Sequence, residues 1–143
     1  MIYTSLTCRA MQIAYKAHHG QFDKSGIPYI YHPIHLAEQM TDEYTTCTAL
    51  LHDVVEDTCV TLEDLKEIFP PEVTDAVSLM THNPSVPYME YVKTIKQNPV
   101  ARAVKIADLI HNSDTTRIIG TNTDPESVRM RLEKYQAALK ILL

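Results

Sequence analysis

The chain has 143 residues, 45% of them hydrophobic, which suits one domain (residues 1–143) with a single core. Its formal net charge of −5 at pH 7 argues against a broadly basic surface, and therefore against a nucleic acid polymer as partner. No apolar stretch approaches the roughly 18 residues that span a bilayer, and residues 1–6 lack the features of a signal peptide. We therefore expect a cytoplasmic protein with no membrane partner.

The first third of the chain shows helical periodicity broken by one loop. Apolar side chains recur at helical spacing over residues 5–19, and a polar loop with glycine and proline follows over residues 20–29. Pro33 suits a first helical turn, which makes His32 the expected N-cap of a second helix over residues 32–40.

The rest of the chain also divides into helices. Thr61 and Asp64 resemble a capping box, and Asn98 and Asp124 each precede a proline, as is typical of a helix start. Helices are expected over residues 42–58, 61–69, 71–80, 88–97, 100–112 and 125–143. Neither an alternating strand pattern nor an internal repeat is present. The sequence thus predicts an all-α fold of about seven to eight helices.

One segment of the third helix, residues 50–58 (LLHDVVEDT), combines an imidazole and three carboxylates with apolar neighbours. Burying a charge without a partner costs several kcal/mol per ion. On a helix, His52 shares a face with Glu56, which lies four residues later. Asp53 is placed in the same way relative to Asp57. A divalent cation would compensate these groups.

Two residues elsewhere can complete such a site. Asp108 lies on one helical line with Val104 and Asn112, so it faces inward and needs a partner. His32, at a helix start, presents its side chain at an edge. Two imidazoles and two carboxylates suit one Mn²⁺ or Fe²⁺ ion and, less well, Zn²⁺. Four protein ligands on an octahedral ion leave two positions for water and a phosphate oxygen, an arrangement that suits hydrolysis.

Simpler interpretations exist for the single residues. Residues 52–57 could form a solvated acidic helix face, although their apolar neighbours leave little room for one. Asp108 could be a salt-bridge partner of Lys105 or Arg102, and His32 could serve only as a helix cap.

Four sequence blocks, in order, carry more information than the His-Asp pair alone. They are residues 19–21 (HGQ), 24–33 (KSGIPYIYHP), 49–58 (ALLHDVVEDT) and 105–108 (KIAD) with His111 and Asn112. Together they resemble the HD-domain metal-dependent phosphohydrolases, and in particular the hydrolase domain of Rel/SpoT enzymes and the small alarmone hydrolases. The resemblance runs from about residue 10 to residue 117 and implies a helical bundle of the HD type.

The resemblance also implies an activity, the Mn²⁺-dependent removal of the 3′-pyrophosphate of (p)ppGpp. The metal ligands would be His32, His52, Asp53 and Asp108. Glu56 and Asp57 would orient or deprotonate the attacking water. Lys24 and Ser25 would line the nucleotide pocket, and Asn112 would contact the substrate beside the metal.

Three positions differ from the pattern of the alarmone hydrolases. Asp23, Leu109 and Asp114 stand where those enzymes usually have basic residues. Two alternatives therefore stay open beside (p)ppGpp hydrolysis: an HD phosphohydrolase for another nucleotide or phosphoester, and a nucleotide sensor without catalysis. Glu56 and Asp57 count against the sensor, which needs no pair of residues to activate water. In each case the expected partner is a small anionic nucleotide.

Overall fold

Helices make up the secondary structure of the residues that the computed structural model describes, 1–118 and 123–143. Within these ranges a single isolated β-bridge, between Phe22 and Pro28, is the only strand-like pairing. The helices are α1 (Ser5–Ala17), α2 (Tyr31–Glu38), α3 (Glu43–Leu51), α4 (Val54–Asp57), α5 (Leu62–Lys66), α6 (Pro71–Met80), α7 (Tyr88–Lys96), α8 (Pro99–Asn112), the 3₁₀ turn η1 (Thr115–Arg117) and α9 (Pro125–Leu142). The predicted all-α fold is confirmed. None of the described helices is both long enough and apolar enough to cross a membrane.

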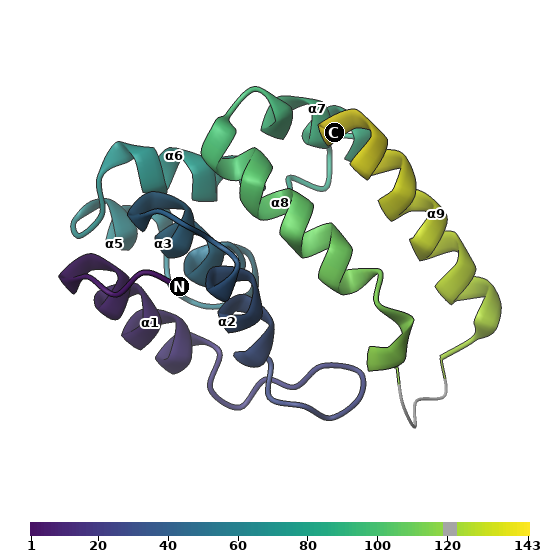
Figure 1. Cartoon of the computed structure of the whole chain (residues 1–143), viewed down its shortest axis with the longest axis horizontal. Helices are drawn as coiled ribbons and strands as arrows, with labels where there is room; N and C mark the ends of the chain where they lie inside the picture. Colours follow the sequence, from purple (N-terminus) through teal and green to yellow (C-terminus); the bar gives the residue numbers. More distant parts are fainter. Residues whose placement is uncertain (119–122) are drawn as a thin grey trace.

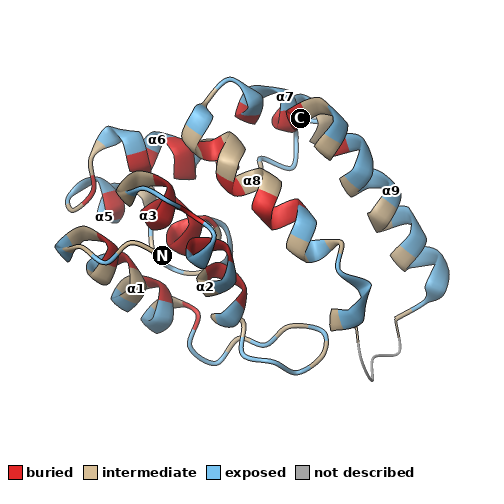
Figure 2. Ribbon diagram, in the orientation of Figure 1, coloured by how far each residue is buried: buried red, intermediate tan, exposed pale blue. Residues whose placement is uncertain are grey.

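Helix α3 lies at the centre of the packing and contacts α1, α2, α6 and α8. Helix α8 runs between the group formed by α1, α2 and α3 and the last helix, α9 (Figure 1). Buried residues concentrate on α3, α6 and α8, whereas α9 is mostly exposed (Figure 2). Leu50, Leu51 and Leu109 are fully buried in this core. The buried helices α3 and α8 therefore support part of the candidate site, since His52 and Asp53 directly follow α3 and Asp108 lies on α8.

Several helix starts follow the capping signals in the sequence. The Thr61 hydroxyl accepts a hydrogen bond from the Asp64 backbone N–H at 3.1 Å, and Asp64 accepts one from the Thr61 N–H at 3.0 Å. Asn98 accepts from the Ala101 N–H at 3.0 Å, and Asp42 caps α3 in the same way. Caps of this kind contribute about 1 kcal/mol each. The capping box and the Asn98 cap are confirmed.

The helix expected over residues 42–58 is interrupted in the structure, so that prediction of one continuous helix was wrong. Helix α3 ends at Leu51, and α4 begins at Val54 after a turn at His52 and Asp53. The backbone of Asp53 has φ −106° and ψ 0°, outside regular helical geometry. On an unbroken helix neighbouring side chains diverge by about 100°. The turn allows these two neighbours to reach one common point.

His32 is not the N-cap of α2, contrary to the expectation from Pro33. The N-cap is Ile30, and His32 lies within the first turn, where its side chain is buried. Proline is tolerated there because the first-turn amides have no acceptor within the helix. Asp124 precedes α9 as expected, but its carboxylate makes no capping hydrogen bond to the backbone.

The loop between α1 and α2 is ordered by Asp23. Its Oδ1 accepts hydrogen bonds from the backbone N–H groups of Ser25 at 2.8 Å and Ile27 at 3.0 Å. Gly26 has φ 79°, a left-handed backbone conformation that residues with a side chain rarely adopt. The loop therefore has a defined shape, which brings Lys24 and Tyr29 to the candidate site.

Candidate active site

Four side chains from three parts of the chain meet beside α3 and α8. His32 Nε2 lies 3.0 Å from Asp108 Oδ1, and His52 Nε2 lies 3.1 Å from Asp53 Oδ2. His52 Nε2 also lies 3.8 Å from Asp108 Oδ1. Ligand atoms of His32, His52 and Asp53 are all within 4.8 Å of one another. The structure thus brings together the four residues that the sequence suggested as metal ligands.

The surroundings of His52 fit a metal ion. Its Nδ1 lies 2.7 Å from the Ala49 carbonyl oxygen, to which it donates a hydrogen bond. Its Nε2 is buried and, although Asp53 Oδ2 lies 3.1 Å away, makes no hydrogen bond of regular geometry in the part of the chain that the structure describes. A buried ring nitrogen that faces carboxylates requires either a proton or a cation. The donor set, two imidazoles and two carboxylates, is suitable for a divalent cation.

Asp108 is held as a carboxylate by its neighbours on α8. Lys105 Nζ lies 2.9 Å from Oδ2, and the Asn112 amide donates to Oδ1 at 2.9 Å. Burial opposes ionisation, but the Lys105 ammonium and the hydrogen bond with His32 hold the pKa of Asp108 well below its usual range. Asp108 is therefore ionised at neutral pH, as a metal ligand must be.

Asp53 has a second partner that sequence reasoning did not single out. The hydroxyl of Tyr29 donates a hydrogen bond to Asp53 Oδ2. Burial raises the pKa of Asp53, but His52 and Tyr29 outweigh this effect and lower it to about 2. Burial and the Asp53 charge raise the pKa of Tyr29 far above its ordinary value, so the phenol stays a donor.

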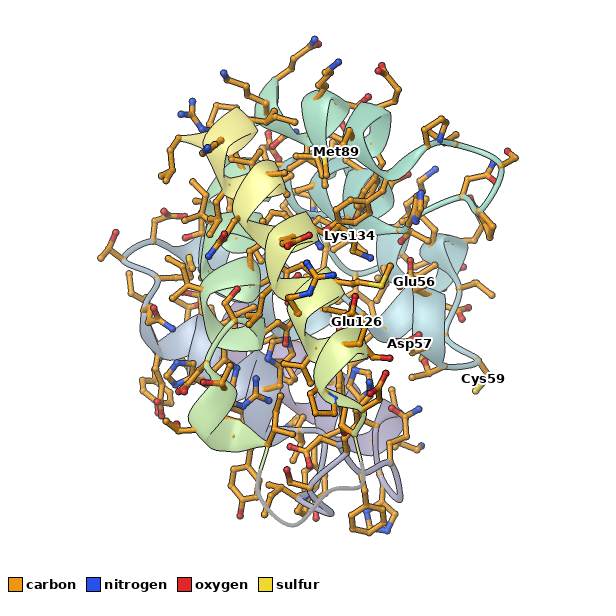
Figure 3. All side chains as sticks on the ribbon, turned by 90° about the vertical axis from the view of Figure 1, so that its right-hand side faces the viewer. Glu56, Asp57, Cys59, Met89, Glu126 and Lys134 are labelled. Atoms are coloured by element: carbon orange, nitrogen blue, oxygen red, sulfur yellow. The ribbon has the colours of Figure 1, made fainter. Side chains whose placement is uncertain are left out.

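Glu56 and Asp57 lie on α4, next to the ligand cluster. Carboxylate oxygens of Asp53, Glu56 and Asp57 lie within 4.8 Å of one another, and Figure 3 shows Glu56 and Asp57 one above the other on this helix. Glu56 Oε1 accepts a hydrogen bond from the His82 backbone N–H at 2.7 Å. Burial and the nearby carboxylates raise the pKa of Glu56 despite this bond, and they raise that of Asp57. A raised pKa improves a carboxylate as a general base.

His111 supports His32 from the side opposite to the cluster. Their Nδ1 atoms lie 2.7 Å apart, and the two rings stack with centroids 5.0 Å apart. Burial and the Arg117 guanidinium lower the pKa of His111 to about 4, so His111 is neutral at pH 7. One of the two Nδ1 atoms carries the shared hydrogen, and this contact orients the His32 ring. Such partners commonly fix metal-binding histidines.

Among the described residues, cavities border the cluster on more than one side. One of ≈ 780 Å³ extends from His32 over α2 and His111. A second, of ≈ 340 Å³, is lined by all three residues that the sequence suggested as substrate contacts, Lys24, Ser25 and Asn112. A third, of ≈ 320 Å³, borders His52 and Asp53 on the side of Glu56. The structure therefore places the suggested substrate residues on one side of the cluster and the suggested base on the other.

Sequence reasoning missed two residues that contact the site, Tyr29 and His82, and undervalued a third, Lys105. Lys105 stood only as a salt-bridge alternative, although its spacing of three from Asp108 predicts contact on a helix. Tyr29 lies inside a matching sequence block but has no local signal of its own. His82 acts through its backbone N–H, which no sequence pattern reveals.

Comparison with known proteins identifies the family. Residues 10–109 match a family model described as "HD domain". The chain belongs to the HD domain family. HD domains bind a divalent metal ion, and the His/Asp cluster of this HD domain has a composition suited to one.

Curated relatives of this HD domain include enzymes of alarmone metabolism. It is 39% identical over 140 residues to the GTP pyrophosphokinase of Streptomyces coelicolor, covering 89% of this chain and 16% of that protein. It is 32% identical to the guanosine-3′,5′-bis(diphosphate) 3′-pyrophosphohydrolase of Borreliella burgdorferi, covering 89% and 21%. It is 30% identical to the bifunctional (p)ppGpp synthase/hydrolase SpoT of Escherichia coli, covering 89% and 20%. The match thus spans no more than about a fifth of these relatives.

A solved structure matches nearly the whole HD domain. It is that of a metazoan orthologue of SpoT that hydrolyses ppGpp and plays a role in starvation responses. The TM-score is 0.79 at 25% sequence identity, and the alignment covers 99% of this chain and 88% of the other. The expected helical fold of the HD type is confirmed.

Proposed function

We propose that the protein is a Mn²⁺-dependent hydrolase that removes the 3′-pyrophosphate from (p)ppGpp. The observation that carries this proposal is the position of Glu56 and Asp57, whose carboxylates share an oxygen cluster with Asp53 beside the two histidines. A group able to hold a cation and a group able to accept a proton from water are thus adjacent. The similarity to (p)ppGpp hydrolases supports the choice of substrate.

Each group of the site has a distinct role in this proposal. A divalent cation held by His32, His52, Asp53 and Asp108 would polarise the phosphoryl group and make water more acidic. Glu56, positioned by the His82 N–H, accepts a proton from the attacking water. The water oxygen forms a bond to phosphorus, the bond to the ribose 3′-oxygen breaks, and that oxygen takes up a proton. The products are pyrophosphate and GDP or GTP.

Two of the three departures from the alarmone pattern favour the second candidate, a phosphohydrolase for a less highly charged nucleotide or phosphoester. Asp23 and Asp114 both line the two cavities beside His32. Their carboxylates are engaged locally, Asp23 by the backbone of its own loop and Asp114 by the Thr116 N–H at 3.0 Å. Leu109 is fully buried in the core and lines none of these three cavities.

Turnover of a substrate panel tests the proposal. The purified protein is stripped with a chelator, reloaded with Mn²⁺, Fe²⁺ or Zn²⁺, and incubated with ppGpp, pppGpp, other nucleotides and a simple phosphoester. Release of pyrophosphate and GDP from ppGpp, fastest with Mn²⁺, is the expected result. Phosphate from another substrate would favour the second candidate, and tight binding of ppGpp without product would favour a sensor. The cytoplasmic location stays a prediction from the sequence.

A further inference from the structure

Arg131 of α9 has a position that the metal centre does not explain. It lies beyond residues 10–109, which the family model matches. Its Nη2 atom is buried yet has no hydrogen-bond partner among the described residues. A buried charged donor without a hydrogen-bond partner lowers the stability of a protein. We therefore expect a ligand group that accepts hydrogen bonds to bind there.

The space in front of Arg131 is the cavity of ≈ 340 Å³ that reaches His32. Lys24 lines it from the loop between α1 and α2, and Asn112 lines it from the end of α8. A molecule in this cavity can therefore contact Arg131 while another part of it lies at the metal ligands.

Some of the basic side chains around this cavity already have partners, and others have no salt bridge. Arg117 donates to the His111 carbonyl oxygen at 2.8 Å and lies 3.9 Å from Asp23 Oδ2, so its guanidinium is already engaged. Lys24 and Arg131 have no carboxylate within salt-bridge distance in the described ranges 1–118 and 123–143. Two cations without a salt-bridge partner thus border this cavity, and among the described residues that line it the cations (Lys24, Arg117 and Arg131) outnumber the carboxylates (Asp23 and Asp114), which favours an anionic ligand.

The geometry points to Arg131 and Lys24 as a binding site for the 5′-diphosphate of the nucleotide, the phosphates that do not react. This inference rests on the proposed function and names the residues that select its substrate. A guanidinium binds phosphate oxygens with two parallel hydrogen bonds, and a lysine adds a point charge. Arg131 on α9 would then supply positive charge that the alarmone hydrolases usually have at the positions of Asp23 and Asp114.

A matched pair of arginines on α9 tests the inference. Arg131→Met removes the proposed contact, whereas Arg129→Met changes an exposed arginine that pairs with Glu126 and Glu133. For Arg131→Met we expect KM for ppGpp to rise about ten- to a hundredfold, with kcat within about threefold of the unchanged protein. Affinity for GDP should fall by a similar factor, and affinity for guanosine should not change. Arg129→Met should leave all four values unchanged.

Other outcomes separate this inference from the proposed function. If the unchanged protein hydrolyses ppGpp and Arg131→Met keeps the same KM, the inference is wrong while the proposed function stands. If the unchanged protein does not hydrolyse ppGpp, the proposed function fails. GDP binding then tests the inference by itself. Equal GDP affinity in the unchanged protein and in Arg131→Met would overturn the inference. An equal loss of guanosine affinity would indicate base stacking and also overturn it. Lys24→Met, at an exposed loop position, repeats the test without risk to the fold, with the same outcomes expected.

Discussion

Lys105 Nζ lies 2.9 Å from Asp108 Oδ2, one helical turn away on α8, and the two side chains are only 11% and 7% exposed. The rings of Tyr88 and Tyr91 cover the ammonium, with centroids 6.0 and 5.4 Å from Nζ. Aromatic faces favour a cation at such distances. The buried carboxylate therefore has a compensating charge even before a metal binds.

Removing this ammonium should destabilise the metal-free protein. Lys105→Met is expected to lower the free energy of unfolding by about 3 kcal/mol, because it leaves Asp108 buried without its nearest cation. Saturating Mn²⁺ should recover part of the loss, since it adds positive charge at the same carboxylate. Urea denaturation with and without Mn²⁺ measures both effects. The control Lys93→Met, in an exposed pair with Glu90, should change the value by less than about 1 kcal/mol; an equal loss in both variants would contradict the prediction.

Asp53 should be required for metal binding. Asp53→Ala removes one carboxylate ligand and exposes the His52 ring to an unfilled space, so Mn²⁺ affinity should fall at least a hundredfold and turnover should disappear with it. Titration with Mn²⁺ and the metal content after dialysis measure the affinity, and circular dichroism checks the helices. Asp75→Ala changes an exposed aspartate of α6 and should leave affinity and turnover unchanged. Retained stoichiometric Mn²⁺ in Asp53→Ala would exclude Asp53 as a ligand.

Glu56 should affect rate and not metal affinity. Glu56→Gln keeps the shape of the side chain but removes its basicity, so kcat should fall about 10²- to 10⁴-fold while Mn²⁺ affinity stays within about threefold. Steady-state hydrolysis of ppGpp and Mn²⁺ titration separate the two quantities. Glu63→Gln, at a side chain that is 82% exposed on α5, is the control. If Glu56→Gln kept full activity, Glu56 would not be the general base, and Asp57 would be the remaining candidate for that role.

Mn²⁺ affinity should rise with pH because a proton competes for His52. Burial lowers the pKa of His52, but the Asp53 and Asp108 carboxylates outweigh it and raise the pKa to about 9 in the metal-free protein. The ring is thus protonated at pH 7, and a metal must displace that proton. Affinity should increase by up to about tenfold per pH unit below pH 9. Calorimetry in buffers of different ionisation enthalpy should show about one proton released per Mn²⁺ at pH 7; constant affinity between pH 6 and 8 would refute the mechanism.

Much of this architecture was predictable because its signals are local. Helix periodicity and caps such as Asn98 depend on residues a few positions apart, and the structure confirms the expected all-α fold. The turn at His52 and Asp53 was not predictable in this way. No glycine or proline marks it, and both residues are compatible with a helix.

The partners of the metal ligands were harder to predict. Tyr29 reaches Asp53 across 24 residues of sequence, and His82 reaches Glu56 across 26. Such contacts depend on how the helices pack, and no pattern within one helix encodes them. Arg131 was missed for the same reason, since its place in the cavity that Lys24 also lines depends on where α9 lies.

Helix α9 is buried most deeply near its C-terminal end (Figure 2). Its buried residues are Ala138 and Leu142, both in its last two turns, whereas Arg131 lies nearer its start. Amide hydrogens in the first turns of α9 should therefore exchange with deuterium faster than those near Leu142. A nucleotide that engages Arg131 would add a contact between the more exposed first turns of the helix and the body of the protein, and slower exchange in these turns would report its arrival.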